Sequence, residues 1–212
     1  MKCRLEPSAE KKAKLQKEQE EKERQEAMRQ IIDENEMEQV EEWTSMKCQE
    51  VLFDSNKDDW DNGSSVFDSR VKNRGDLLFI VEDSNNNKFG GYVNAVISRF
   101  ASYSRETSDE MRRNCIHDSN AFLFSLKSNG RIDRMMKFPV VESETVLRVF
   151  ESYDREGDLF EFGWADMRVY KSHKTSSCYA CNGSSFSYNG VQNALCGQRD
   201  FTVKRVAVIQ MK

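Results

Sequence analysis

The sequence predicts a mainly β fold of the α+β class: a two-sheet antiparallel β-sandwich surrounded by short helices and preceded by a long charged N-terminal helix. Three observations predict it. Many short apolar runs are separated by turn-forming residues, the helical patterns between them are brief, and residues 8–43 contain neither glycine nor proline. Short strands without long helical crossovers favour antiparallel sheets over βαβ units.

Length and composition predict one core with an appendage. The 212 residues are 38% hydrophobic, which is enough for one sizeable core. We expect a disordered tail at 1–8, a charged helix or linker at 9–42 and a single domain at 43–212. The net charge of −4 comes from the N-terminal segment, because residues 1–50 carry 10 Lys/Arg and 14 Asp/Glu. Residues 51–212 carry 22 of each and are neutral by count. A neutral domain argues against nucleic acid as the main partner.

The start of the chain predicts a cytoplasmic protein. It shows no apolar segment of the secretory type, and no run in the sequence is long and apolar enough to cross a bilayer, so we expect no membrane insertion. Six cysteines are widely spaced in a chain that has its own core. Reduced thiols are therefore expected rather than a disulfide framework.

Residues 8–43 read as one helix, which begins after Pro7. Opposite charges recur four residues apart, as at Lys14/Glu18 and Glu18/Lys22, and such pairs support a solvated helix. A heptad that starts at Leu15 places Glu18 and Lys22 on the seam, so a stable two-stranded coiled coil is not supported. Apolar residues gather near Trp43, so this last part is expected to dock on the domain.

Charge along this helix opposes the helix dipole, with lysines early and carboxylates late. That layout suits antiparallel self-association with a second copy, or docking on a complementary partner. A solvated helical linker is the favoured interpretation.

The stretch from Asp76 to Ile97 organises the domain, because two apolar runs flank the turn residues Ser84 to Asn87 and predict a β-hairpin. Residues 77–81 are all apolar, which predicts a central strand covered on both faces. The pair Gly90-Gly91 predicts a bulge or a close approach of another backbone segment.

The other elements follow from the same patterns. A capping box at Ser65 to Asp68 predicts a short helix at 66–73 that stops at Gly75. Residues 98–119 read as a loop or irregular helix. Strands are expected at 51–53, 121–126, 131–138, 146–150, 159–162, 167–170, near Phe186 and at 203–211.

Cys178-Tyr-Ala-Cys181 is the pattern most typical of chemistry, since two thiolates at this spacing bind zinc or cycle as a dithiol. His173 and Cys196 complete a possible ligand set. Residues three apart on a strand point to opposite faces, so a turn would have to bring the two sulfurs together. No catalytic residue set and no cofactor is predicted.

Asp54, Asn56 and Asp58 begin like a calcium loop, but Asp59 and Ser65 stand where such a loop has Gly and Glu. Turn formation is the expected role of this segment.

The order of these segments from about Trp43 to Lys212 resembles the TLDc family. Phe89-Gly90-Gly91-Tyr92 is similar to the Phe-Gly-x-aromatic signature of that family, and Phe162-Gly163 to its later Phe-Gly. Two features differ: the Gly-rich run before the later Phe-Gly is reduced to Gly157, and Ala207-Val208-Ile209 replaces a Glu-x-Trp. The chain therefore resembles a divergent branch.

The resemblance implies a β-sandwich, a link to protection against oxidative stress (oxidation resistance), and binding to vacuolar proton ATPase (V-ATPase) subunits. No catalytic residues come with it. We therefore expect a non-catalytic protein-interaction module. The alternative is a redox or zinc-binding protein that uses Cys178 and Cys181.

Overall fold

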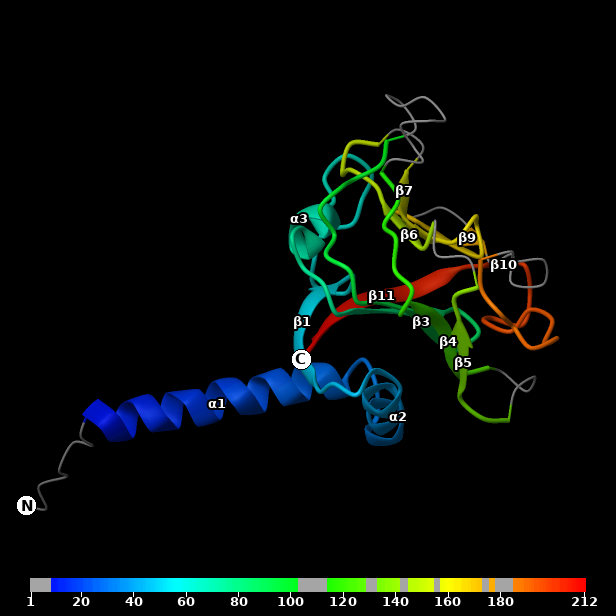
Figure 1. The fold of residues 1–212 in the computed structure, drawn as a ribbon. Coiled ribbons are helices and arrows are strands. Elements are labelled where there is room, and N and C mark those ends of the chain that lie inside the picture. The colour runs from blue at the N-terminus through cyan, green and yellow to red at the C-terminus, as the bar shows by residue number, and fades with distance from the viewer. Residues whose placement is uncertain are drawn as a thin grey trace, which may run out of the picture.

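The computed structural model describes residues 9–102, 114–128, 133–141, 145–154, 157–172, 176–177 and 185–212. Two antiparallel sheets lie face to face, a helix covers the outer face of the larger sheet, and the first helix projects from the side (Figure 1). The prediction of a mainly β sandwich with a long charged N-terminal helix is confirmed.

The larger sheet has the order β1-β11-β2-β3-β4-β5 and the smaller sheet the order β10-β9-β8-β7-β6. All neighbouring strands in both sheets are antiparallel. The strands are β1 (Cys48–Asp54), β2 (Leu77–Asp83), β3 (Lys88–Val93), β4 (Phe122–Lys127), β5 (Met136–Pro139), β6 (Leu147–Val149), β7 (Asp158–Phe162), β8 (Met167–Tyr170), β9 (Ser176–Ser177), β10 (Asp200–Phe201) and β11 (Val203–Met211).

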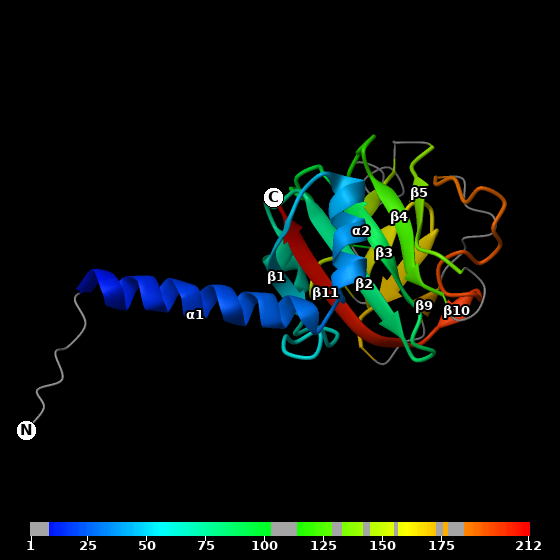
Figure 2. The same cartoon turned by 90° about the horizontal axis from the view of Figure 1, so that it is seen from below.

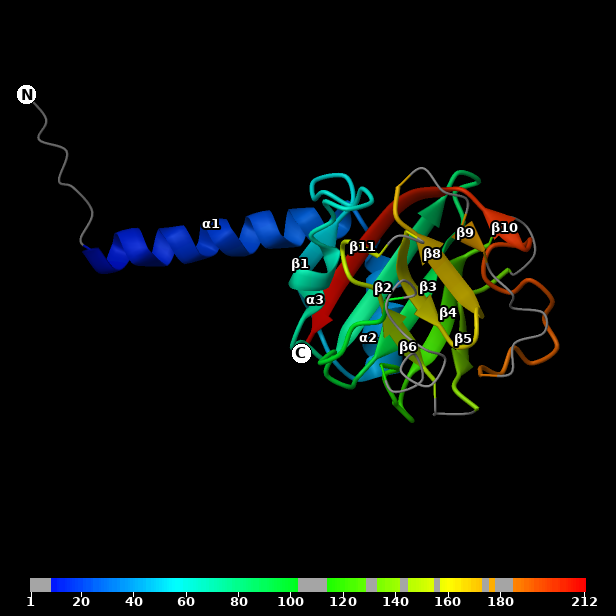
Figure 3. The same ribbon diagram turned by 90° about the horizontal axis from the view of Figure 1, so that it is seen from above.

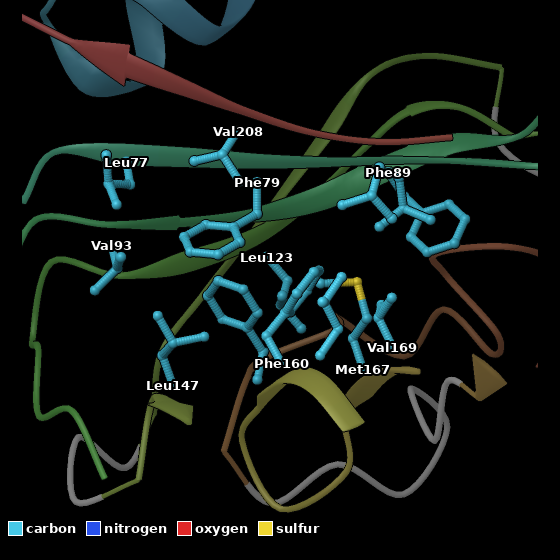
Figure 4. Close-up of a cluster of buried hydrophobic side chains, with 14 of the residues drawn as sticks. Leu77, Phe79, Phe89, Val93, Leu123, Leu147, Phe160, Met167, Val169 and Val208 are labelled. Carbon is cyan, nitrogen blue, oxygen red and sulfur yellow. The ribbon is translucent and has the colours of Figure 1, made fainter. Parts of the chain in front are cut away.

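Strand β2 lies inside the larger sheet and is covered on both faces, as its unbroken apolar run predicts. Leu77, Phe79 and Val81 belong to the core between the two sheets, where Figure 4 shows Leu77 and Phe79 among side chains from both. Leu78 and Ile80 point to the other face and join a second apolar cluster. Because successive side chains of a strand point to opposite faces, β2 contributes side chains to two separate cores.

The two glycines of β3 allow neighbouring groups to lie close to this strand. They do not form a bulge, because the β2–β3 register runs through them without a shift. A Cβ atom at Gly91 would lie 2.6 Å from the Phe162 ring of the opposite sheet. A Cβ atom at Gly90 would meet the carbonyl oxygen of Phe79. Any larger residue at either position would force the sheets or strands apart.

The prediction of one helix over residues 8–43 is wrong at residues 30–33. The structure has two helices there, α1 (Ala9–Arg29) and α2 (Glu34–Thr44). Ile31 and Ile32 are buried in the second cluster, which turns the chain onto the sheet. Asp33 then caps α2 in a capping box, since its side chain accepts the Glu36 N–H and the Glu36 side chain accepts the Asp33 N–H, both at 2.9 Å.

Helix α2 forms the third layer, across the outer face of the larger sheet (Figure 2). Val40 is fully buried there beside the end of α1. The expected docking of this part on the domain is therefore found.

The helix expected at 66–73 is shorter, α3 (Phe67–Val71), and the predicted capping box is absent from it. Ser65 Oγ instead accepts the Phe67 N–H at 3.2 Å, two residues on. Asp68 is one methylene shorter than the usual Glu, and its carboxylate accepts the N–H groups of Ser69 and Ser152. The helix ends before Asn73, which takes a φ of 59°.

Several loops differ in detail from the expected pattern. The strand expected near Phe186 is a single bridge to Val140. The described parts of 98–119 form isolated bridges through Ala101 and Ile116. The tail 1–8 and the start of the strand expected at 131–138 lie outside the described residues.

None of the helices in the described ranges combines the length and apolar character needed to cross a bilayer.

Candidate protein-interaction surfaces

Arg205 of β11 anchors the base of α1. Its guanidinium donates from Nε and Nη2 to the two carboxylate oxygens of Asp54, at 2.9 and 2.7 Å, and from Nη1 to the backbone carbonyl of Gln30. Burial alone raises the pKa of Asp54, but the hydrogen bonds and charge of Arg205, with the Asn56 N–H, outweigh burial and lower it. The calcium-like segment is therefore a turn that holds an ion pair.

Two lysines fix α2 on the sheet at its opposite ends. Near the start of α2, Lys88 Nζ lies 2.5 Å from the buried Glu36 carboxylate. At its end, Lys137 Nζ donates to the Trp43 carbonyl at 3.0 Å and lies 4.1 Å from the centre of the Phe122 ring. Burial lowers the pKa of Lys137. A cation at the carbonyl end of a helix is favourable.

Helix α1 projects from this base as an arm (Figures 1, 2 and 3). All its side chains from Glu10 to Glu23 are exposed, whereas Met28 is buried. The bonds that stabilise the arm lie within it, including Lys14 to Glu18 at 3.8 Å and Gln19 to Glu23 at 2.6 Å. At 1.5 Å per residue the helix is about 30 Å long.

A cleft of about 230 Å³ lies where α1, α2 and β1 meet. Its apolar part comes from Met28, Met37 and Cys48, and carboxylates such as Glu34 and Glu41 line the rest. Burial, followed by the charge of Glu41, raises the pKa of Cys48 to about 12. This thiol is therefore protonated and unreactive at neutral pH.

The turn between β7 and β8 presents an aromatic side chain on a fixed base. Trp164 is 48% exposed, and the Arg148 guanidinium carbon lies 5.0 Å from the centre of its indole ring. Arg148 is buried and paired with Glu161 at 2.8 Å. Glu161 also accepts the Ala165 N–H at 2.6 Å. The indole thus rests on a cation that the sheet holds in place.

Val141 lies near the same turn and is 64% exposed. Ser185 connects the two, because its carbonyl accepts the Val141 N–H at 2.7 Å and its hydroxyl accepts the Trp164 N–H at 3.3 Å. Two large exposed apolar side chains therefore share one support.

Asp166 is the buried support of this turn. Its Oδ1 accepts the Tyr188 hydroxyl at 2.9 Å, and Oδ2 has no hydrogen-bond partner. Burial raises the pKa of Asp166 to about 6, with a further contribution from Glu161, against the lowering effect of Tyr188 and Ser185. Gly163, at a φ of +61°, leaves room for this carboxyl group.

The residues that carry the family resemblance lie mostly in the two apolar cores. Phe89 packs edge-on against Phe201 at 5.1 Å, and Phe162 covers Gly91. Tyr92 lies on the outer face, where its hydroxyl donates to Asp76 at 3.0 Å. These positions hold the sheets together.

Most residues of the alternative zinc or redox site lie outside the described residues, namely Cys178, Cys181 and His173. Cys196 is described; it is 4% exposed, and its Sγ donates to the Gln198 carbonyl at 2.9 Å. Among the residues that the structure places, no group of three His, Cys, Asp or Glu could hold a metal ion.

Sequence reasoning missed the Trp164 turn and the anchors of both helices. The four residues between the strands that end at Phe162 and begin at Met167 indicate a turn, but not that its tryptophan is exposed. The partners of Arg205 are far from it in sequence, and no local pattern predicts them.

No family model matches this chain, and the search of curated proteins found no match either.

Proposed function

We propose that the chain is a non-catalytic protein-interaction module of the TLDc type, which contacts a protein partner through α1 and through the Trp164 turn. The observation that carries the proposal is α1, a helix of 21 residues that projects from an anchored base, with all its side chains from Glu10 to Glu23 exposed. Because the helix is already formed and its base is fixed, less conformational entropy is lost when a partner binds it.

The Trp164 turn supports the same proposal with a second contact. Tryptophan is among the residues that most often dominate the binding energy of interfaces, and pre-organised side chains bind with the smallest ordering cost. The backbone bonds to Ser185 and Glu161 supply that pre-organisation.

The TLDc resemblance adds a named candidate partner, subunits of the vacuolar proton ATPase, and a process, protection against oxidative stress. Both are proposals that rest on the resemblance.

The test is a capture experiment with the full chain as bait and immunoblots for proton-ATPase subunits. Trp164→Ala should lower their recovery by about tenfold or more, as expected for a central interface tryptophan. The control is Val96→Ala, which truncates an apolar residue that is 54% exposed on another loop and should leave recovery unchanged.

If the unaltered chain recovers no proton-ATPase subunit, the proposal of this partner is wrong. If the Trp164→Ala variant recovers as much of the subunits as the unaltered chain does, the Trp164 turn is not part of the binding surface. Equal losses with both variants would point to non-specific adhesion and count against the proposal.

A further inference from the structure

The arm α1 carries two halves of opposite charge. Residues 10–17 hold four lysines and one glutamate, whereas residues 18–26 hold five glutamates, one lysine and one arginine. The halves therefore have net charges of +3 and −3. Except for the half-buried Arg24, all these charged side chains are exposed.

This order is unfavourable for an isolated helix. The N-terminal end of a helix dipole is positive and the C-terminal end is negative, so lysines early and glutamates late place each charge at the wrong end. The charges would be better placed beside a helix that runs in the opposite direction.

A second copy of α1 is such a helix. In an antiparallel pair with two-fold symmetry the basic half of each arm lies along the acidic half of the other, and the two dipoles also oppose. The same residues make the contact in both copies, so the charge pattern of α1 is complementary to itself. A parallel pair would place like charges side by side.

The shape of the molecule permits this pairing. The arm extends away from the domain in all three views, so two arms can overlap along their length with the two domains at opposite ends (Figures 1, 2 and 3). The lysine half of one arm then approaches the base of the other, where Glu21, Glu34 and Glu41 line the cleft between α1 and α2.

We infer that two copies of this chain associate through antiparallel pairing of their α1 arms, with residues 10–17 of each copy against residues 18–26 of the other. The driving force is electrostatic, because Leu15 is the one large apolar residue on the outer part of the arm. Exposed ion pairs contribute only about 0.2–1 kcal/mol each, so the dimer is weak and dissociates as salt is added.

The experiment is sedimentation equilibrium of the purified full chain at about 50 and about 500 mM NaCl, a range over which screening of exposed charges becomes strong. The unaltered chain should self-associate at low salt, with a dissociation constant that rises about tenfold or more at high salt. A monomer at both salt concentrations, up to about millimolar protein, overturns the inference.

Charge reversal makes the test specific. The variant K11E/K12E/K14E gives both halves of the arm a charge of −3, and E18K/E20K/E23K gives both halves +3. Each variant alone should be monomeric, and an equimolar mixture should form a heterodimer. The matched control K11R/K12R/K14R keeps the charges and should behave like the unaltered chain.

Dimers of either reversed variant alone, or failure of the mixture to associate, would show that the arms do not pair as described. Far-ultraviolet circular dichroism would confirm that each variant keeps its helix. This test uses the purified chain alone, so its outcome is independent of the proposed partner and can be told apart from a failure of the capture experiment.

Discussion

Gly91 and Phe162 come from different sheets, yet each requires the other. The phenylalanine ring occupies the space that a side chain on the glycine would fill, with a Cβ-to-ring distance of 2.6 Å. Overfilling a packed core costs about 1–3 kcal/mol. This packing gives a physical reason for both residues to be present.

Protonation of Asp166 should affect the stability of the fold directly. Its pKa is raised to about 6 in the folded protein because it is buried, whereas an exposed aspartate in the unfolded chain has a pKa near its ordinary value of 3.8. The folded state therefore binds the proton more tightly. The stability that this gives is fully present below pH 3.8 and is lost as pH rises through 6.

The substitution Asp166→Asn tests this pH dependence. Relative to the unaltered protein, the variant should gain up to about 3 kcal/mol of unfolding free energy between pH 4 and pH 7, because the amide never becomes charged. Urea unfolding of both proteins at several pH values measures the difference. A difference that does not change with pH would contradict the prediction. Asp54 serves as the opposite case, since its pKa is lowered and its contribution is lost as pH falls.

At the scale of elements, the junction between α1 and α2 decides how the N-terminal region is used. Helix propensity alone favours a continuous helix through residues 30–33. Burial of Ile31 and Ile32 and the cap at Asp33 outweigh that propensity. The result is one helix that packs and one that projects.

Asp33→Ala should destabilise α2 without disturbing α1. Loss of an N-cap side chain costs about 1 kcal/mol, and its effect is local to the first turn of the helix. Hydrogen exchange should therefore speed up at the Glu36 amide, which Asp33 accepts in the folded protein. Asn35→Ala is the control, since Asn35 is exposed in the same turn and should leave exchange there unchanged. Equal exchange rates in both variants would argue against the capping box.

At the scale of the whole molecule, the protein is a sandwich with three layers and one arm. The first layer is the smaller sheet, the second is the larger sheet, and α2 with the end of α1 forms the third. The outer part of the arm, residues 10–23, lies outside both cores, so its sequence is free to serve binding while the layers serve stability.

Two truncations separate these roles. Removal of residues 1–26 takes away the outer part of the arm but leaves Met28 in place, so it should shift the melting temperature by no more than about 2 °C. Removal of residues 1–44 also strips Met28, Ile31, Ile32 and Val40 from the second cluster. Burial of each such side chain contributes about 1.5–3 kcal/mol, so this truncation should lower the melting temperature by well over about 10 °C or prevent folding. Calorimetry distinguishes the two, and similar melting temperatures would contradict the assignment of α2 to the core.

The sequence by itself determined the local features of this protein. Its short apolar runs place β2, β3, β8 and β11, and its charge pattern makes residues 9–29 a solvated helix, because strand and helix preferences depend on neighbours in the chain. Of the candidate interaction surfaces, the arm could be predicted and the Trp164 turn could not. The break before Asp33 also has a local signal, since an Asp followed three residues later by Glu36 is a capping pattern. The tertiary structure alone decided that Arg205 joins Asp54 to the base of the arm and that Trp164 faces solvent over Arg148. These outcomes depend on which distant side chains meet after the sheets pack, and no local pattern contains that information.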